Sequence, residues 1–368
     1  MSKLQRVASI DFLRGLSCLG ILLYHVRVDL WVGWRELSNF PESYTAFERA
    51  VAWLSVPAPF LGHAILLFFL ISGFCIHYPQ TNGSTPNWNS YLLRRFFRIY
   101  PPYFVAVALT VAITYLCHLL WNDETWDPSR IWRVLSLTQN YPPGKGQLLS
   151  NPSLWTIPLE MEFYVLYPLA FIFFSKLKSS LLWIVTGFLS ALSVYLSSQG
   201  VAWTSFTALF FWPVWLLGAW TAQLYHDNRL QSLSYWNVVP VLSLSLALSL
   251  ASRLQGWDAW IQYLLWTCFY LCLLFLSLSW RNPSSNSVLR ALYHLLSWLG
   301  KISFSVYLVH FPLFKLFGYL HISIFAEKPA NFIVSLGYLC LVCPLGWLFY
   351  LCVERPVHFW SRNRIRAK

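Results

Sequence analysis

Charged residues are scarce in this sequence. Only 11% of its 368 residues are Asp, Glu, Lys or Arg, whereas a soluble domain carries about a quarter. In their place, 57% of the residues are hydrophobic and 19% are aromatic. The composition argues against an ordinary soluble domain and predicts a chain whose surface meets lipid.

Acidic residues are the scarcer of the two charge types, with 14 Asp and Glu against 26 Lys and Arg. The net charge of +12 would suit a nucleic-acid partner. However, the basic residues gather in short segments between apolar runs, as they do on the cytoplasmic face of a membrane protein. We therefore expect membrane lipids, and not nucleic acid, to face these charges.

Gly/Ser linkers, charge blocks and low-complexity tracts are also missing, so we expect one integral-membrane domain over residues 1–368, with no additional soluble domain. A cleavable signal peptide is not expected, since MSKLQRVASIDFLRGL lacks an uninterrupted apolar core before a small-residue cleavage site. The eight cysteines are scattered. Cys340 and Cys343 form a CxxC inside an apolar helix, where packing residues are expected more than a redox or metal pair. No metal site is predicted.

Apolar runs of roughly 18 to 23 residues recur along the whole chain, and each is long enough to cross a hydrocarbon core of about 30 Å. They predict an all-α, polytopic membrane protein with about ten transmembrane helices. The predicted spans are 8–28, 57–78, 100–121, 153–174, 181–198, 203–224, 237–252, 257–279, 299–320 and 332–353.

The charges between these spans predict that both termini are cytoplasmic, in a cell (inner or plasma) membrane. In that orientation the cytoplasmic segments carry only two acids, Asp227 and Glu354. Their basic residues are Lys3, Arg6, Arg94, Arg95, Arg98, Lys176, Lys178, Arg229, Arg281, Arg290, Lys301, Arg355, Arg362, Arg364, Arg366 and Lys368. Two segments of the opposite side, about 28–56 and 122–152, are long, and loops of such length are often functional.

Ionisable side chains inside a bilayer are costly, and those that occur usually face a cavity or a partner. Leaving aside Lys315, which is expected near an outer helix end, we take the intramembrane set to be Asp11, Arg14, His25, Glu160, Glu162 and His310. Arg14 and His25 are separated by three helical turns, so they share a helix face about 16 Å apart. Asp11 lies within ion-pair reach of Arg14. These residues are either a neutralised pair with an interfacial histidine or parts of a site.

Glu160 is expected about 10 Å inside the outer surface, at a depth comparable with that of His25. Glu162 is about 200° further round the same helix, so the two carboxylates cannot face one cavity. Judged alone, each glutamate is explained better as a packing or interfacial polar group than as a catalyst. The shared depth with His25 favours Glu160 as the site residue.

Arg94, Arg95 and Arg98 stand together at the predicted cytoplasmic mouth of the third span. They either set the topology and contact anionic lipids, or bind ligand phosphates, for which the guanidinium fork is well shaped.

Two further stretches combine small residues with aromatic ones. Ser72 and Gly73 in the second span either allow close helix packing or belong to a site. His310, in the ninth span, is either a site group or a hydrogen-bonded packing histidine. Tyr307 lies in the same stretch and is a further candidate.

Six stretches occur in one order between residues 10 and 356: IDFLRGLSCLGILLYH, FFLISGFCI, YLLRRFFRIYPPYF, SLWTIPLEMEFYVLYPL, LGKISFSVYLVH and VERP. Together they resemble the membrane-bound acyltransferase-3 family, the integral-membrane O-acyltransferases. The resemblance implies transfer of an acyl group from acyl-CoA to a hydroxyl of a sugar, often in a cell-surface or lipid-linked glycan. It also implies that Arg14 and His25 are essential and that Glu160 is the family's invariant carboxylate.

The sequence departs from the family pattern at three points. Met161 follows Glu160 where a second Glu is frequent, and Leu66 replaces a polar residue often found before the FF of the second span. The extracytoplasmic acetyl-carrying domain of some relatives is not in this sequence. A role that rests on a second carboxylate, or on a relay through that domain, is therefore not expected.

The resulting hypothesis makes His25 the general base for the acceptor hydroxyl. Glu160 orients the His25 ring or holds the acceptor, Arg14 positions the acyl-CoA, and the arginines of 94–98 bind its phosphates. Acetyl-CoA is the favoured donor substrate, with no permanently bound cofactor and no covalent acyl-enzyme. The alternative is a proton-coupled transporter of a small molecule, because carriers also use intramembrane Asp, Glu, His and Arg.

Overall fold

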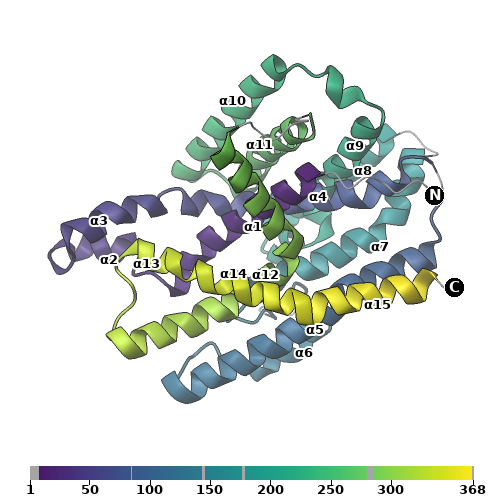
Figure 1. Ribbon diagram of the computed structural model, residues 1–368. Coiled ribbons are helices and arrows are strands. Elements are labelled where there is room, and N and C mark those ends of the chain that lie inside the picture. The colour runs from purple at the N-terminus through teal and green to yellow at the C-terminus, as the bar shows by residue number, and fades with distance from the viewer. Residues whose placement is uncertain (1–7, 84, 143–145, 176–178, 280–285, 367–368) are drawn as a thin grey trace. The chain divides into compact units, whose positions relative to one another are not determined.

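The computed structural model describes residues 8–83, 85–142, 146–175, 179–279 and 286–366. These residues form helices joined by irregular segments, and no strand occurs among them (Figure 1). Several basic residues used above for topology lie outside the described part of the chain, namely Lys3, Arg6, Lys176, Lys178, Arg281 and Lys368.

Fifteen α-helices are described. They are α1 (Ala8–Asp29), α2 (Trp34–Asn39), α3 (Ala46–Ala52), α4 (Ile65–His77), α5 (Trp88–Trp121), α6 (Ile131–Leu135), α7 (Thr156–Ser175), α8 (Ser179–Ser198), α9 (Ala208–His226), α10 (Tyr235–Leu254), α11 (Ala259–Ser279), α12 (Ser287–Phe325), α13 (Phe332–Gly337), α14 (Leu339–Phe349) and α15 (Arg355–Arg366). Shorter helical segments include the 3-10 turn η6 (Pro152–Trp155) before α7 and the π-helical η9 (Tyr350–Glu354) before α15.

Ten segments of the described chain are long and apolar enough to cross a membrane, which confirms the predicted number of spans. Some are longer than predicted, because an apolar window stops where a helix continues through polar or basic residues. The clearest case is α5, which begins at Trp88 and runs through Pro101 and Pro102, so the arginines of 94–98 lie within the helix and not before it. In the same way, α12 extends the predicted span 299–320 to Ser287–Phe325.

The chain is divided into two compact units. Unit 1 comprises Met1–Ser17, His63–Arg95 and Pro158–Lys301, and unit 2 comprises Cys18–Gly62, Phe96–Ile157 and Ile302–Lys368. Helices α1, α5, α7 and α12 contribute residues to both. The predicted site residues therefore fall in both units.

In unit 1, α4 packs against α9 at two glycines. A Cβ atom on Gly73 would lie 1.9 Å from the carbonyl oxygen of Trp215, and one on Gly218 would lie 1.9 Å from that of Leu70. Such distances mean that the two backbones touch, which only glycine permits. Of the two interpretations left open for Gly73, close helix packing is the one that the structure shows.

A second backbone contact in unit 1 joins α1 to α12. A Cβ atom on Gly15 would lie 1.8 Å from the carbonyl oxygen of Leu296, and one on Gly300 would lie 1.8 Å from that of Asp11. The glycines of the RGL and LGK sequences therefore bring α12 against the helix turn that carries Arg14.

Candidate functional site

Arg14 is half-buried on α1, and its contacts lie within unit 1. Its Nη2 donates to Cys75 Sγ over 3.3 Å, and its Nη1 is 3.9 Å from Asp11 Oδ1. The predicted ion pair is therefore present at the long limit of such contacts, where its contribution is small. Arg14 is held by α4 as well as by its own helix.

Glu160, on α7, also contacts α4 within unit 1. Its Oε1 accepts from Ser72 Oγ over 3.5 Å and from the hydroxyl of Tyr164. Ser72 Oγ in turn accepts from the indole N–H of Trp215 over 3.2 Å. Ser72 is thus a hydrogen-bonding residue and not only a small packing residue.

The same face of α4 serves both predicted site groups of unit 1. Ser72 contacts Glu160, and Cys75, one helical turn later, contacts Arg14. Arg14 and Glu160, which lie on different helices and far apart in the sequence, therefore contact residues one helical turn apart on α4.

Arg95 connects this group to the basic part of α5. Its guanidinium lies over the rings of Tyr91 and Tyr164, 5.6 and 5.7 Å from their centroids. Tyr164 is the residue whose hydroxyl binds Glu160. Among the other arginines, Arg94 is exposed in unit 1 and Arg98 is half-buried in unit 2.

Glu162 has different surroundings from Glu160. Its Oε2 accepts from the backbone N–H of Ala208 over 2.6 Å, at the first residue of α9. A carboxylate at a helix N-terminus satisfies an unpaired N–H and interacts favourably with the helix dipole. The two glutamates face different neighbours, as predicted, and Glu162 stabilises a helix end.

His25 is half-buried on α1, and its contacts lie in unit 2. Its Nδ1 is 2.8 Å from His310 Nε2 on α12, and the two ring planes differ by only 12°. His310 is fully buried, and its Nδ1 is 2.7 Å from the carbonyl oxygen of Tyr307. For Nε2 of His25 no hydrogen-bond partner is found within the described residues.

Tyr307 joins this pair of histidines to the end of the 122–152 loop. Its hydroxyl donates to the carbonyl oxygen of Ser153 over 2.6 Å and is 2.8 Å from Thr156 Oγ1. Asn151 is buried beside it and donates through Nδ2 to the carbonyl oxygen of Leu308 over 3.0 Å. The loop thus ends against the turn of α12 that carries His310.

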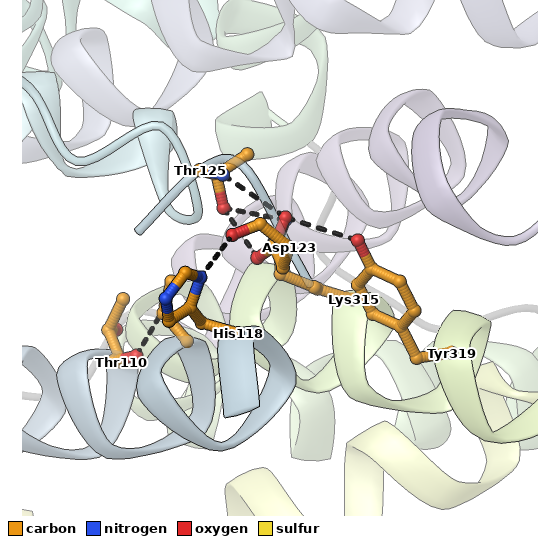
Figure 2. A network of polar contacts seen from close by, with 7 residues as sticks. Thr110, His118, Asp123, Thr125, Lys315 and Tyr319 are labelled. Atoms are coloured by element: carbon orange, nitrogen blue, oxygen red, sulfur yellow. Dashed lines mark hydrogen bonds and ion pairs between the residues drawn. The ribbon is translucent and has the colours of Figure 1, made fainter. Parts of the chain in front are cut away.

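The beginning of the same loop is held by a buried ion pair (Figure 2). Lys315 Nζ, on α12, donates to both carboxylate oxygens of Asp123 over 3.0 and 3.1 Å. Thr125 and Tyr319 donate to the same carboxylate over 2.7 and 3.1 Å. His118 lies below it and is 3.1 Å from the Asp123 carbonyl oxygen. The sequence interpretation set Lys315 aside as a residue near a helix end and did not pair it with Asp123.

A family model described as an acyltransferase domain matches residues 7–351. The chain belongs to the acyltransferase-3 family. No curated protein and no solved structure matches it. Membership confirms the resemblance seen in the six sequence stretches and makes this protein a membrane acyltransferase, so transfer is favoured over the proton-coupled carrier.

The predicted site residues of the acyltransferase belong to two different units. Unit 1 holds Asp11, Arg14, Ser72, Arg94, Arg95 and Glu160, and unit 2 holds His25, Arg98, Tyr307 and His310. Sequence reasoning named both members of the histidine pair but did not pair them. It missed Cys75, Tyr164, Asn151 and the Asp123–Lys315 pair. The sequence did carry a signal for the Asp123–Lys315 pair: Lys315 lies in an apolar span, five residues after His310. A buried cation needs a partner of opposite charge.

Proposed function

We propose that this membrane acyltransferase transfers an acyl group, acetyl in the simplest case, from acyl-CoA to a hydroxyl of a sugar in a cell-surface or lipid-linked glycan. The observation that carries the proposal is the state of His25. One ring nitrogen is engaged by His310, and the other has no protein hydrogen bond in the described chain, on a ring that is only partly buried. A general base has this arrangement.

In the proposed reaction, His25 Nε2 takes the proton of the acceptor hydroxyl while the oxygen attacks the thioester carbonyl carbon. The tetrahedral intermediate then expels the CoA thiolate, which receives the proton from His25. An ester and free CoA are the products. No protein nucleophile takes part, and His25 returns to its starting state.

The arginines bind the donor in this proposal. Arg14 positions the acyl-CoA, and the arginines of 94–98 bind its phosphates, since guanidinium groups suit phosphate geometry. The contact from Arg95 through Tyr164 to Glu160 supports a binding surface that continues from the basic part of α5 to the carboxylate. The proposal keeps both termini on the cytoplasmic side of an inner or plasma membrane, and Glu160 as the group that holds the acceptor or acts on His25.

The test is transfer of radiolabelled acetyl from acetyl-CoA to glycan or lipid-linked sugar acceptors by the purified protein. His25→Ala should lower transfer by roughly 10²- to 10⁴-fold, the usual contribution of a general base. The matched control is His63→Ala, which removes another half-buried histidine, one that stacks on Trp266. Insertion and detergent-extracted yield should be the same for both variants.

Three outcomes would count against the proposal. Normal transfer by His25→Ala removes His25 from the chemistry. Label bound covalently to the protein, and chased to the acceptor, shows an acyl-enzyme. Transfer from acyl donors other than CoA thioesters, with acetyl-CoA inactive, shows that the donor was wrongly chosen.

A further inference from the structure

The two histidines of unit 2 form one directed line of hydrogen bonds. It runs from His25 Nδ1 to His310 Nε2 over 2.8 Å, and from His310 Nδ1 to the Tyr307 carbonyl oxygen over 2.7 Å. A carbonyl oxygen can only accept, so Nδ1 of His310 carries a hydrogen. In a neutral imidazole the other nitrogen is then an acceptor. Full burial of His310 favours the neutral ring, because an unpaired buried charge is costly.

The protonation of His25 follows from that of His310. Since His310 Nε2 accepts, Nδ1 of His25 must donate, and the lone pair of a neutral His25 is on Nε2. The ring planes differ by 12° and the ring centroids are 5.1 Å apart. With only 2.8 Å between the two nitrogens, these values describe two imidazoles that meet edge to edge, so a hydrogen in the plane of one ring points toward the in-plane lone pair of the other. The nitrogen that remains able to accept a proton is the one without a protein partner in the described chain.

We infer that His310 is the positioning residue of the acyltransferase: together with the Tyr307 carbonyl, it fixes His25 in the tautomer whose Nε2 is free to act as the base. This inference about the tautomer stands on the contacts alone, and its catalytic meaning rests on the proposed function. His310 is fully buried and contacts His25, so it acts through the other ring.

Pro312 and Asn151 hold the helix turn that carries His310. A proline at 312 has no N–H for the carbonyl oxygen of Leu308, four residues earlier. Asn151 Nδ2 donates a hydrogen bond to that carbonyl oxygen instead, over 3.0 Å, and also donates to Thr110 Oγ1 over 3.3 Å. A side chain from the loop thus fills the place of a helix hydrogen bond beside His310, so the histidine and the end of the loop are held together.

Aromatic rings pack against both imidazoles and restrict their rotation. Phe311 lies edge-on to His25 with a centroid separation of 5.1 Å, and Phe314 lies edge-on to His310 at 5.7 Å.

When the proton from the acceptor arrives on His25 Nε2, the Nδ1 hydrogen stays in its bond to His310. That bond strengthens, because a charged donor makes a stronger hydrogen bond than a neutral one.

The direct test is nitrogen-15 NMR of the full-length protein with labelled histidine, since the chemical shift of each ring nitrogen reports whether it carries a hydrogen. The signals of His25 are those lost in His25→Gln. We expect the tautomer with hydrogen on Nδ1. In His310→Leu, which removes the acceptor, the His25 signals should change to a mixture or to the other tautomer.

Activity provides the second measurement. His310→Leu should lower transfer of labelled acetyl by roughly 10²-fold or more, because a misoriented base loses much of its catalytic contribution. His310→Gln, whose amide oxygen is an acceptor near the position of Nε2, should recover a large part of that loss. His321→Leu is the matched control, because it removes another buried histidine of α12, one that contacts the Tyr338 hydroxyl.

The outcomes separate this inference from the proposed function. Hydrogen on Nε2 of His25 in the unmodified protein would overturn the inference whatever the activity. Hydrogen on Nδ1 together with a fully active His25→Ala would keep the tautomer and overturn the proposed base. If His310→Gln is no better than His310→Leu, while both show the same thermal midpoint as the unmodified protein, the acceptor role of His310 is wrong.

Discussion

Glu160 and Glu162 lie two residues apart on α7 and have different tasks because of what each one touches. Glu160 accepts from Ser72 and from Tyr164, whose ring lies under Arg95. Glu162 accepts from a backbone N–H at the start of α9. At the scale of single residues, each helical position is rotated by about 100° from the one before it. Glu160 therefore lies beside the predicted donor site, whereas Glu162 faces another neighbour and caps a helix.

The two glutamates should respond differently to the same substitution. Glu160→Gln should lower transfer at least tenfold with little change in thermal stability, because a neutral amide keeps the shape and loses the charge. Glu162→Gln should keep transfer and lower stability by about 1 kcal/mol, since a neutral acceptor interacts less well with a helix N-terminus. Transfer assays and thermal unfolding in one detergent give both quantities. A loss of transfer confined to Glu162→Gln would show that the site uses the other face of α7.

At the scale of elements, backbone contact sets how the helices of unit 1 pack. Gly300 and Gly15 place α12 against α1, and Gly73 and Gly218 place α4 against α9. No side-chain movement can relieve a collision between a Cβ atom and a carbonyl group of another helix. These contacts, and not the hydrophobic character of the helices, fix their spacing in lipid, where apolar side chains gain little by choosing one another over acyl chains.

A glycine-to-alanine pair tests this point. Gly300→Ala places a methyl group 1.8 Å from the Asp11 carbonyl oxygen, and we expect a loss of stability on the order of 3 kcal/mol or more, at the upper end of overpacking costs. Gly187→Ala, in α8, has open space around its Cβ and should be neutral or stabilising by about 0.5–1 kcal/mol. Thermal midpoints of the two variants in the same detergent provide the comparison. Equal midpoints would mean that α1 and α12 are not in backbone contact.

At the scale of the whole molecule, the 122–152 loop of unit 2 is held at both ends by α12. Asp123 is bound to Lys315 and Tyr319, and the other end meets Tyr307 and Leu308. His310 lies between these two attachment points along the helix. Loops that are fixed to a rigid element on both sides of a reactive group are suited to shape its surroundings.

The ion pair at the start of the loop makes stability depend on pH. Burial raises the pKa of the Asp123 carboxyl, but hydrogen bonds from Thr125 and Lys315 and the charge of Lys315 outweigh it, so the pKa lies below its usual range. Asp29 is a further acidic group that faces Asp123. A carboxyl group whose pKa is lower in the folded state stabilises the protein at pH values above its unfolded pKa of about 4. This stabilisation is lost as the pH falls from there toward the folded-state pKa.

We therefore expect the thermal midpoint to fall as the pH is lowered from 5 toward the folded-state pKa of Asp123. Asp123→Asn should be less stable at neutral pH by about 3–5 kcal/mol, because the buried ammonium loses its partner. The control is Asp123→Asn with Lys315→Met, which removes both charges and should restore part of that loss. If this double variant keeps the full pH dependence of the unmodified protein, the acid sensitivity comes from other carboxyl groups.

The amino-acid sequence by itself determined the number of spans and the positions where charge enters them. Ten apolar segments were found because hydropathy is a local property, and Arg14, His25 and Glu160 were found because an ionisable group in an apolar run is costly at any position. Helix ends were less well predicted, as at α5 and α12, where the helix continues beyond the apolar window.

Only the tertiary structure decided which groups meet. His25 pairs with His310 across 285 positions of sequence, and Lys315 pairs with Asp123 across 192. Local patterns give the face of a helix on which a residue lies, but not the neighbouring helix that it meets, because that is set by backbone contacts at a few glycines and by the satisfaction of buried polar groups. For the same reason the sequence pattern favoured Glu160 as a partner of His25, and that role stays a prediction. The contact of His25 with His310 was found only in the folded chain.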